Sequence, residues 1–197
     1  MKTLLVELKT SLLLTAVLVV LLCGAYPLAV WAGAQALFPA KANGSLIVDR
    51  DGTVRGSELL AQNFGSARSF QPRPSAAGTG YDAINSSGTN LGPTSQKLAD
   101  SIKAAVATYR ATNDLAADAP VPADAVTSSA SGLDPHISVA NALIQARRVA
   151  RERHLPLSAV EALVAALTED RDLGLLGEPR INVLLLNLAL DRIPAGR

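Results

Sequence analysis

The sequence is poor in the residue types that build disulfides, metal centres and nucleic-acid surfaces. It has one cysteine, Cys23, which excludes an intramolecular disulfide and a multi-cysteine metal site. Its two histidines would need carboxylates to complete a zinc site, so we expect no metal. A net charge of +1 provides no basic excess for binding a phosphate backbone, so we expect no nucleic-acid partner.

Motifs for catalysis are also scarce. The chain has neither a Gly-x-x-x-x-Gly-Lys-Ser/Thr phosphate loop nor a Gly-x-Ser-x-Gly nucleophile elbow. Asp134 and His136 place a carboxylate near an imidazole, which could serve as an acid/base pair. Asp-Pro is also a common turn or helix-entry signal, and a structural role for both side chains is the stronger interpretation. A membrane-anchored hydrolase using this pair therefore stays open as an alternative.

One long stretch near the N-terminus lacks charge. Its core, Leu12–Trp31, has twenty residues rich in Leu, Val and Ala, which as a helix span roughly 30 Å, the thickness of the bilayer's hydrocarbon core. Tyr26 and Trp31 lie toward its end, where interfacial aromatic residues are expected. We therefore predict a short tail over residues 1–10, a transmembrane anchor over 11–35 and a soluble domain over 41–197.

A cleaved signal peptide is the alternative for this stretch. Lys2 and Lys9 resemble a positive n-region, and Ala32-Gly33-Ala34 resembles a cleavage site. The apolar run is longer than the roughly 7–15 residues of a typical h-region, which favours a retained anchor. Positive charges on the two sides of the span barely differ, and long domains are exported largely regardless of charge. We expect the N-terminus in the cytoplasm and residues 41–197 outside.

The remainder of the chain alternates short apolar runs with turn signals, which predicts an α+β domain, a small sheet with two or three helices. We predict a strand over 45–49 that turns at Arg50–Gly52 to pair with 53–55, and a buried strand over Ile181–Leu186 for which a short helix is the alternative. Two helices are predicted between them, one capped by Thr94 or Ser95 and one from Ser138 to about Arg153. A third helix begins with the capping box Ser158–Glu161 and buries Val160, Leu163, Val164 and Leu167.

The loop over residues 73–94 is rich in Gly, Ser, Thr and Asn but is not repetitive. Tyr81, Ile84 and Leu91 are spaced through it like anchors, which predicts an ordered loop rather than a linker. Its polar groups and exposed backbone suit binding to another chain. The candidate partner-binding residues are Arg73, Ser75, Tyr81, Asp82, Asn85, Asn90, Gly92 and Thr94.

Four arginines crowd the helix predicted to start at Ser138, namely Arg147, Arg148, Arg151 and Arg153. The default interpretation is a solvated face, in which Arg148 pairs with Glu152 at i,i+4. Docking to an acidic partner or to anionic headgroups is the alternative.

Three separated blocks, residues 73–94, 120–138 and 174–191, together resemble the C subunit of the Kdp potassium-transporting P-type ATPase. Their order and spacing match that family along nearly the whole chain, including the N-terminal apolar segment. The Asp-Lys-Thr-Gly phosphorylation motif of P-type ATPases is absent, so the resemblance is not to the hydrolytic subunit.

The resemblance implies a non-catalytic accessory subunit of a high-affinity potassium uptake pump in a bacterial inner membrane. It implies three partners: the ATPase subunit, a channel-like potassium-binding subunit and a small membrane peptide. It also implies stabilisation of the complex and a raised ATP affinity of the ATPase subunit, a role described as catalytic chaperone. No intrinsic cofactor is implied; ATP enters through the complex, and in this family a glutamine at the position of Gln145 has been linked to nucleotide. A free-standing scaffold module is a further alternative.

Overall fold

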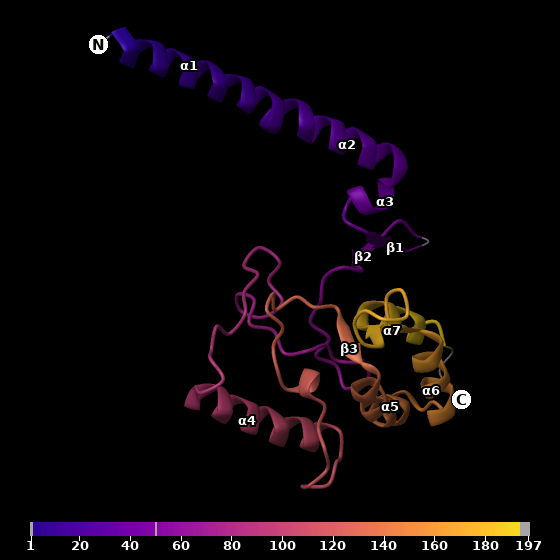
Figure 1. Ribbon diagram of the computed structural model, residues 1–197. Helices are drawn as coiled ribbons and strands as arrows, with labels where there is room; N and C mark the ends of the chain where they lie inside the picture. Colours follow the sequence, from indigo (N-terminus) through magenta and orange to yellow (C-terminus); the bar gives the residue numbers. More distant parts are fainter. Residues whose placement is uncertain (1, 50, 194–197) are drawn as a thin grey trace. The chain divides into compact units, whose positions relative to one another are not determined.

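The computed structural model describes residues 2–49 and 51–193, and the chain divides into two compact units between Leu46 and Ile47 (Figure 1). The first unit is mainly helical. The second holds both small sheets and the remaining helices.

The first unit is dominated by one continuous helix. It is built from α1 (Lys2–Leu18), a π-helical segment η1 (Val19–Ala25) and α2 (Tyr26–Leu37), and it is followed by the short α3 (Pro39–Ala42). Its 35 residues from Thr3 to Leu37 are long and apolar enough to cross a membrane, and this one helix fits a single-pass membrane protein. The predicted anchor, 11–35, lies inside this helix, and the described part of the predicted tail is helical as well.

The π-helical segment has a local cause in the sequence. Pro27 lies two residues after its end, and proline has no N–H to donate to the carbonyl of Cys23. The proline ring would also crowd that carbonyl in a regular α-helix, and a wider π turn relieves the crowding. Such irregularities are tolerated in membrane helices.

The second unit contains a two-stranded sheet, a three-stranded antiparallel sheet and four α-helices in its described part. The elements are β1 (Leu46–Val48), β2 (Val54–Ser57), α4 (Gln96–Thr112), the 3₁₀ turn η2 (Ala123–Ala125), β3 (His136–Ser138), α5 (Val139–Arg153), α6 (Leu157–Ala166), β4 (Thr168–Glu169), β5 (Arg180–Asn182) and α7 (Val183–Leu190). β1 pairs with β2, and β5 lies between β3 and β4, with Ile137 opposite Ile181. The α+β class is confirmed, with a second sheet and more helices than predicted.

Polar side chains start three of these helices. Ser95, Ser138 and Asn182 each accept a hydrogen bond from a backbone N–H in the first turn of α4, α5 and α7. The helices predicted after Ser95 and from Ser138 to Arg153 are therefore confirmed. At its other end α5 stops at His154, which adopts a left-handed conformation with φ of 57°.

Two predicted elements are wrong in detail. Ser158 does not cap α6, because the helix begins earlier, where the carbonyl of Pro156 accepts the first bonds from Ala159 and Val160. The strand predicted over Ile181–Leu186 ends at Asn182, because the Asn182 side chain caps α7. The turn predicted at Arg50 lies outside the described residues.

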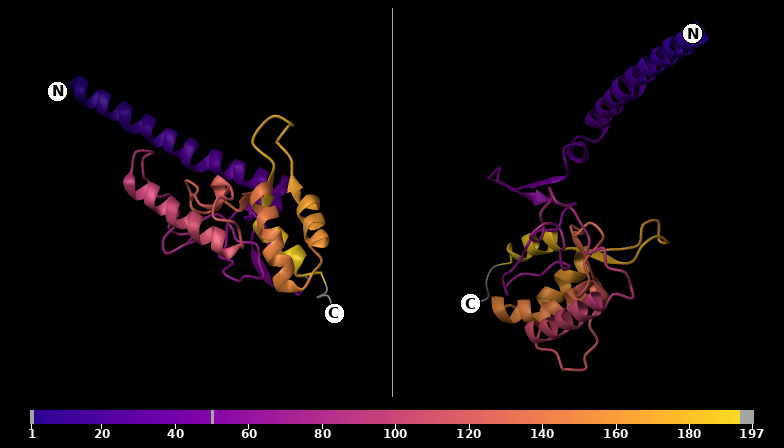
Figure 2. Two further views of the ribbon diagram at one scale, coloured as in Figure 1. Left: turned by 90° about the horizontal axis from the view of Figure 1, so that it is seen from below. Right: turned by 90° about the vertical axis from the view of Figure 1, so that its left-hand side faces the viewer.

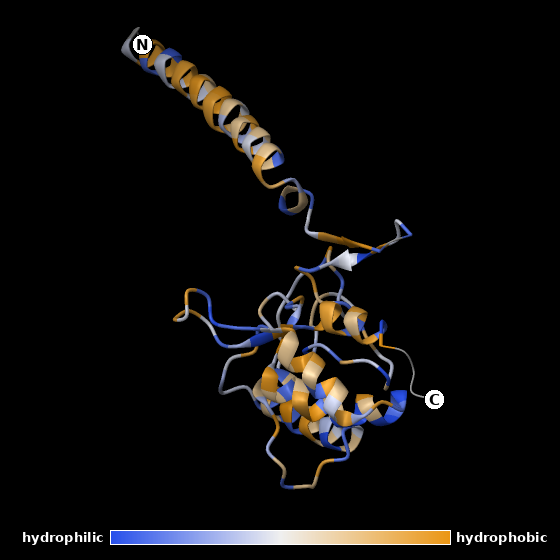
Figure 3. Cartoon of the chain, turned by 90° about the vertical axis from the view of Figure 1, so that its right-hand side faces the viewer, coloured by the Kyte–Doolittle hydropathy of each residue, from blue (hydrophilic) through white to orange (hydrophobic). Residues whose placement is uncertain are grey.

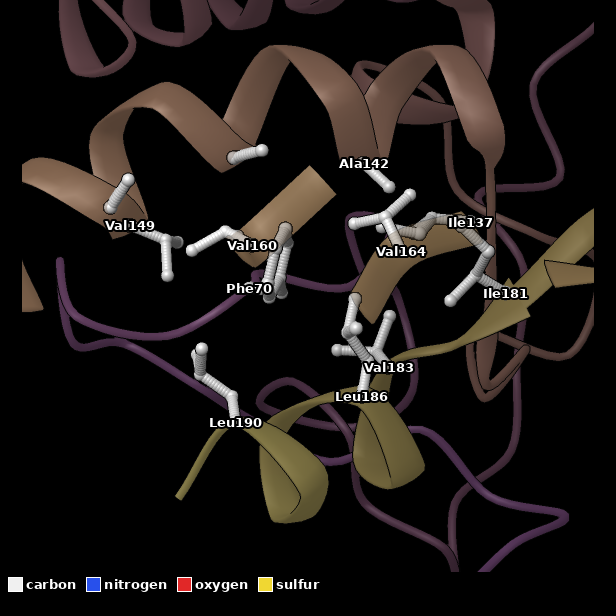
Figure 4. Close-up of a cluster of buried hydrophobic side chains, with 12 residues drawn as sticks. Phe70, Ile137, Ala142, Val149, Val160, Val164, Ile181, Val183, Leu186 and Leu190 are labelled. Atoms are coloured by element: carbon white, nitrogen blue, oxygen red, sulfur yellow. The ribbon is translucent and has the colours of Figure 1, made fainter. Parts of the chain in front are cut away.

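The hydrophobic core of the second unit lies between the helices and the three-stranded sheet (Figure 4). Figure 4 shows Phe70, which comes from an irregular segment, among side chains of α5, α6 and α7. Val160 and Val164 of α6 are buried as predicted, while Leu163 and Leu167 pack against the core and keep partial exposure. Phe70 has no exposed surface, so a segment without regular structure carries one of the largest core side chains.

Candidate partner-binding surface

The first two sequence blocks, residues 73–94 and 120–138, fold against each other. The Arg73 guanidinium pairs with Asp134, with 2.8 Å between Nη1 and Oδ2. The backbone N–H of Ser87 donates to the carbonyl of Ser131 at 3.0 Å, and the Ser86 hydroxyl donates to the same oxygen. Residues far apart in the sequence thus form one surface.

Two glycines allow this close approach. A Cβ added at Gly88 would lie 2.9 Å from the carbonyl oxygen of Ala130. A Cβ at Gly132 would lie 2.6 Å from the carbonyl oxygen of Ser87, and the φ of Gly132 is +67°. Both positions need glycine because backbone lies where a side chain would be.

The third block, residues 174–191, joins the second through backbone bonds. Its strand β5 pairs with β3, and the N–H of Val183 donates to the carbonyl of Pro135 at 2.9 Å. The three blocks that carry the family resemblance are therefore neighbours in the fold.

Half of the candidate residues hold the loop in shape. The Tyr81 hydroxyl donates to the carbonyl of Arg73 at 2.9 Å, and its backbone N–H donates to the Ser75 hydroxyl at 2.8 Å. Burial raises the pKa of Tyr81. Asp82 accepts from the Asn85 amide at 2.6 Å, and hydrogen bonds from Asn85 and the Ile84 backbone lower the pKa of Asp82.

The other candidates lie on the outside of the loop. Asn90, Gly92 and Thr94 are exposed, and so is Asn85. Ile84 is 93% exposed and does not anchor the loop, because its side chain points to solvent rather than to the core. Tyr81, which is half-buried, takes that role. Partner binding by these residues stays a prediction.

The arginines of α5 do not form a uniform solvated face. Arg147 is exposed, but Arg148 is only 2% exposed and does not form the predicted pair with Glu152; Glu152 pairs with Arg151 instead. The Arg148 guanidinium donates to the Asn113 side chain at 3.1 Å and to the carbonyls of Ala67 and Ser69. Burial lowers the pKa of Arg148, although a guanidinium stays protonated in proteins.

Two buried amide side chains bond to the backbone of the residues that follow, Phe70 and Gln71. Gln145 accepts from the N–H of Gln71 at 2.7 Å and donates to its carbonyl at 3.0 Å. Asn187 does the same for Phe70, at 2.8 and 2.9 Å. We call Arg148, Gln145 and Asn187 the polar clamp. It hydrogen-bonds to the backbone of four of the residues 67–71, much as a neighbouring strand would, and Arg153 bonds to the carbonyl of the fifth, Arg68.

A second set of buried polar groups supports the clamp. Asn141 accepts from the Tyr109 hydroxyl at 2.7 Å and from Gln145 at 2.9 Å, and it donates to Asp124 at 2.9 Å. Burial, followed by the nearby carboxylate of Asp124, raises the pKa of Tyr109. This network was not predicted from the sequence. Its signal was the asparagines inside apolar helical runs, at 141 and 187.

Gln145 is only 1% exposed, and its amide is fully engaged. A hollow of about 330 Å³ lies nearby, bounded by Phe64, Tyr81 and Tyr109 among others, but Gln145 is not part of its wall. Direct contact of Gln145 with a nucleotide would first require residues 67–71 to leave the clamp.

The Asp134–His136 pair is part of the same surface. Asp134 accepts from the backbone N–H of His136 at 3.0 Å, and its Oδ1 lies 3.5 Å from His136 Nδ1. Burial opposes ionisation of Asp134, but hydrogen bonds from His136 and Arg73 outweigh it and lower the pKa to about 2. Within residues 2–49 and 51–193, no three His, Cys, Asp or Glu side chains gather in a group that could hold a metal ion.

Comparison with known proteins assigns the family. Residues 8–192 match the family model described as K+-transporting ATPase, c chain. Proteins named potassium-transporting ATPase KdpC subunit are similar to this chain: that of Nitratidesulfovibrio vulgaris is 53% identical over 96% of this chain and 95% of its own length. That of Rhodospirillum rubrum is 55% identical over 93% and 94%, and that of Myxococcus xanthus 58% over 85% and 79%. The chain therefore belongs to the KdpC family.

The polar clamp gives the first prediction. Arg148→Lys should lower the free energy of unfolding by about 2–4 kcal/mol, because an ammonium cannot reproduce the forked contacts and leaves buried acceptors unpaired. Pulse proteolysis of the full chain in mild detergent measures this change. Arg147→Lys, the adjacent exposed position, is the matched control and should shift it by less than about 0.5 kcal/mol. Equal changes in the free energy of unfolding for the two variants would show that the clamp does not stabilise the fold.

The Asp134 ion pair gives a pH prediction. Since the pKa falls from 3.8 to about 2 on folding, the carboxylate stabilises the fold above pH 3.8 and loses that contribution as pH falls toward 2. Asp134→Asn should therefore destabilise the chain at pH 7, and the difference from wild type should shrink between pH 4 and 2. Asp118→Asn, an exposed carboxylate, is the control for general acid effects. A difference independent of pH would contradict this account.

Proposed function

We propose that this chain is a non-catalytic accessory subunit of an ATP-driven potassium uptake pump. The observation that carries the proposal is the family match over residues 8–192, which spans both the membrane-length helix and the second unit. The proposed partners are an ATPase subunit, a channel-like potassium-binding subunit and a small membrane peptide, all in a bacterial inner membrane.

The environment of Asp134 supports an accessory role over hydrolysis. A general base should have a pKa near the working pH, whereas Asp134 has a pKa of about 2 and is committed to Arg73. The backbone N–H of His136 donates to the same carboxylate, and the Nδ1 atom of His136 lies 3.5 Å from it. This pair fits the structural role of joining the first two sequence blocks better than it fits an acid/base function.

In the proposed complex the N-terminal helix packs among the partners' membrane helices. Small residues at Ala16, Gly24 and Ala25 would let helix backbones approach closely. Apart from its own stretch of helix, a Cβ added at Gly24 would meet nothing within 4 Å, so the position is open to a neighbour. The second unit would dock through the loop over residues 73–94 and through the third block.

We further propose that the chain stabilises the assembly and raises the ATP affinity of the ATPase subunit. In this proposal the N-terminus lies in the cytoplasm and the second unit outside, so the second unit does not reach cytoplasmic ATP. The effect on ATP is then indirect, a coupling free energy transmitted through the membrane helices. The engaged amide of Gln145 supports this indirect route.

Assembly is tested by isolating the tagged full chain from potassium-starved cells in mild detergent. We expect stoichiometric recovery of a P-type ATPase subunit and a multi-span potassium-binding subunit. Recovery of the chain alone, with its helix intact and the partners expressed, would reject the proposal and favour the anchored hydrolase or the scaffold module.

The same preparation tests the effect on ATP. Complex that lacks this chain should need a higher ATP concentration for half-maximal hydrolysis than intact complex, because the proposed coupling favours the ATP-bound state. An unchanged ATP dependence would remove the chaperone role and leave assembly as the function.

The proposed topology predicts where protease acts. In right-side-out membrane vesicles, added protease should degrade the second unit, and in inverted vesicles that unit should be protected. A marker protein of the enclosed side, cytoplasmic for right-side-out and periplasmic for inverted vesicles, reports vesicle integrity in each sample. Protection in intact right-side-out vesicles would place the second unit in the cytoplasm instead.

A further inference from the structure

A hairpin between β4 and β5 carries three leucines away from the core. Leu173, Leu175 and Leu176 are 91%, 81% and 62% exposed, in a unit whose other leucines are mostly buried or half-buried. Figure 2 shows this hairpin extending beyond the helices of the second unit, and in Figure 3 the hydrophobic colour gathers at its tip while hydrophilic colour follows its arms. A contiguous apolar tip of this kind marks an interaction site.

The tip is held in a defined shape. Asp172 and Leu176 exchange two backbone hydrogen bonds of 2.9 Å, and the N–H of Gly174 donates to the carbonyl of Arg171 at 3.0 Å. Leu173 adopts a positive φ of 55°, which is costly for a residue with a Cβ. The fold gains no buried side chain in return, so the shape serves to present the leucines.

Ion pairs brace the arms behind the tip. Arg180 reaches Glu169 at 3.2 Å and Asp172 at 3.2 Å, and Arg171 reaches Glu178 at 2.7 Å. These contacts tie the hairpin to β5 and thus to the sheet. An apolar tip on a braced stem loses little conformational freedom when it binds.

Charge on the arms decides between a membrane and a protein as the partner. Four carboxylates, from Glu169, Asp170, Asp172 and Glu178, stand against the guanidiniums of Arg171 and Arg180, an excess of two negative charges. Anionic lipid would repel this stem, and membrane-surface segments carry the Lys, Arg and aromatic residues that this tip lacks.

We infer that the hairpin tip, Leu173–Leu176, inserts into an apolar recess bordered by Lys or Arg side chains on another subunit of the pump. This inference rests on the proposed function, since it requires a protein partner. The leucines would fill the recess, and the acidic arms would face its basic rim.

Site-specific photocrosslinking in the assembled membrane complex tests the inference. Benzoylphenylalanine replaces Leu175 in one full-length variant and Leu59 in the matched control, because Leu59 is also an exposed leucine, at 58%, but lies outside the hairpin. We expect a crosslink from position 175 to another pump subunit and none from position 59. A crosslink from position 175 to lipid alone, or none, would overturn the inference.

A double substitution gives the quantitative test. Leu175→Asp with Leu176→Asp should reduce the partner subunits recovered with the chain by about tenfold or more, because it places charge in an apolar recess. Leu59→Asp should leave recovery unchanged. If wild type recovers its partners and the double variant recovers them equally, the hairpin inference fails alone. If wild type recovers no pump subunit, the proposed function fails first.

Discussion

A short piece of irregular backbone, residues 67–71, depends on side chains for the hydrogen bonds that a sheet would provide. Arg148 of α5 donates to the carbonyls of Ala67 and Ser69. Gln145 of α5 bonds to the backbone N–H and carbonyl of Gln71, and Asn187 of α7 bonds to the same two groups of Phe70. Burying a guanidinium among neutral acceptors is costly unless nearly every donor is used. The clamp meets that condition, and it places the Phe70 ring in the core.

The clamp also positions the candidate partner surface. Residues 67–71 lead directly into the loop that begins at Arg73, whose guanidinium forms an ion pair with Asp134 of the second block. The second block continues into β3, which pairs with β5 of the third block. One chain of contacts therefore runs from the core helices to all three family blocks, and a loosened clamp would displace the surface without altering its exposed residues.

Much of the fold was predictable because its signals are local. The helices after Ser95 and Ser138 follow from hydroxyl caps ahead of periodic apolar residues, and the membrane-length helix follows from hydropathy. The strand-to-helix change at Asn182 was missed because Val, Ile and Leu in that run suit either state, and the cap decides. The burial of Arg148 was missed because its partners are backbone carbonyls about 80 residues away, which no spacing rule reveals.

The candidate partner surface was also predictable only in part. The absence of repetition and the spacing of its apolar residues predicted an ordered loop, and the structure places Arg73, Ser75 and Tyr81 in contacts that shape it. The sequence could not separate those residues from the exposed Asn85, Asn90 and Thr94, because polar side chains of both groups can bond either to the loop or to a partner, and only the tertiary contacts decide. The leucines of the hairpin tip were not singled out from the sequence, because residue type alone does not distinguish an exposed leucine from a buried one.

Amide hydrogen exchange at Phe70 and Gln71 in the full chain tests the central claim most directly. Both N–H groups donate only to the clamp side chains Asn187 and Gln145, so no regular secondary structure protects them. If the clamp holds, these amides exchange as slowly as those in the middle of α5, such as Val149. Exchange as fast as in an unstructured peptide would show that the segment is not held and would contradict the account.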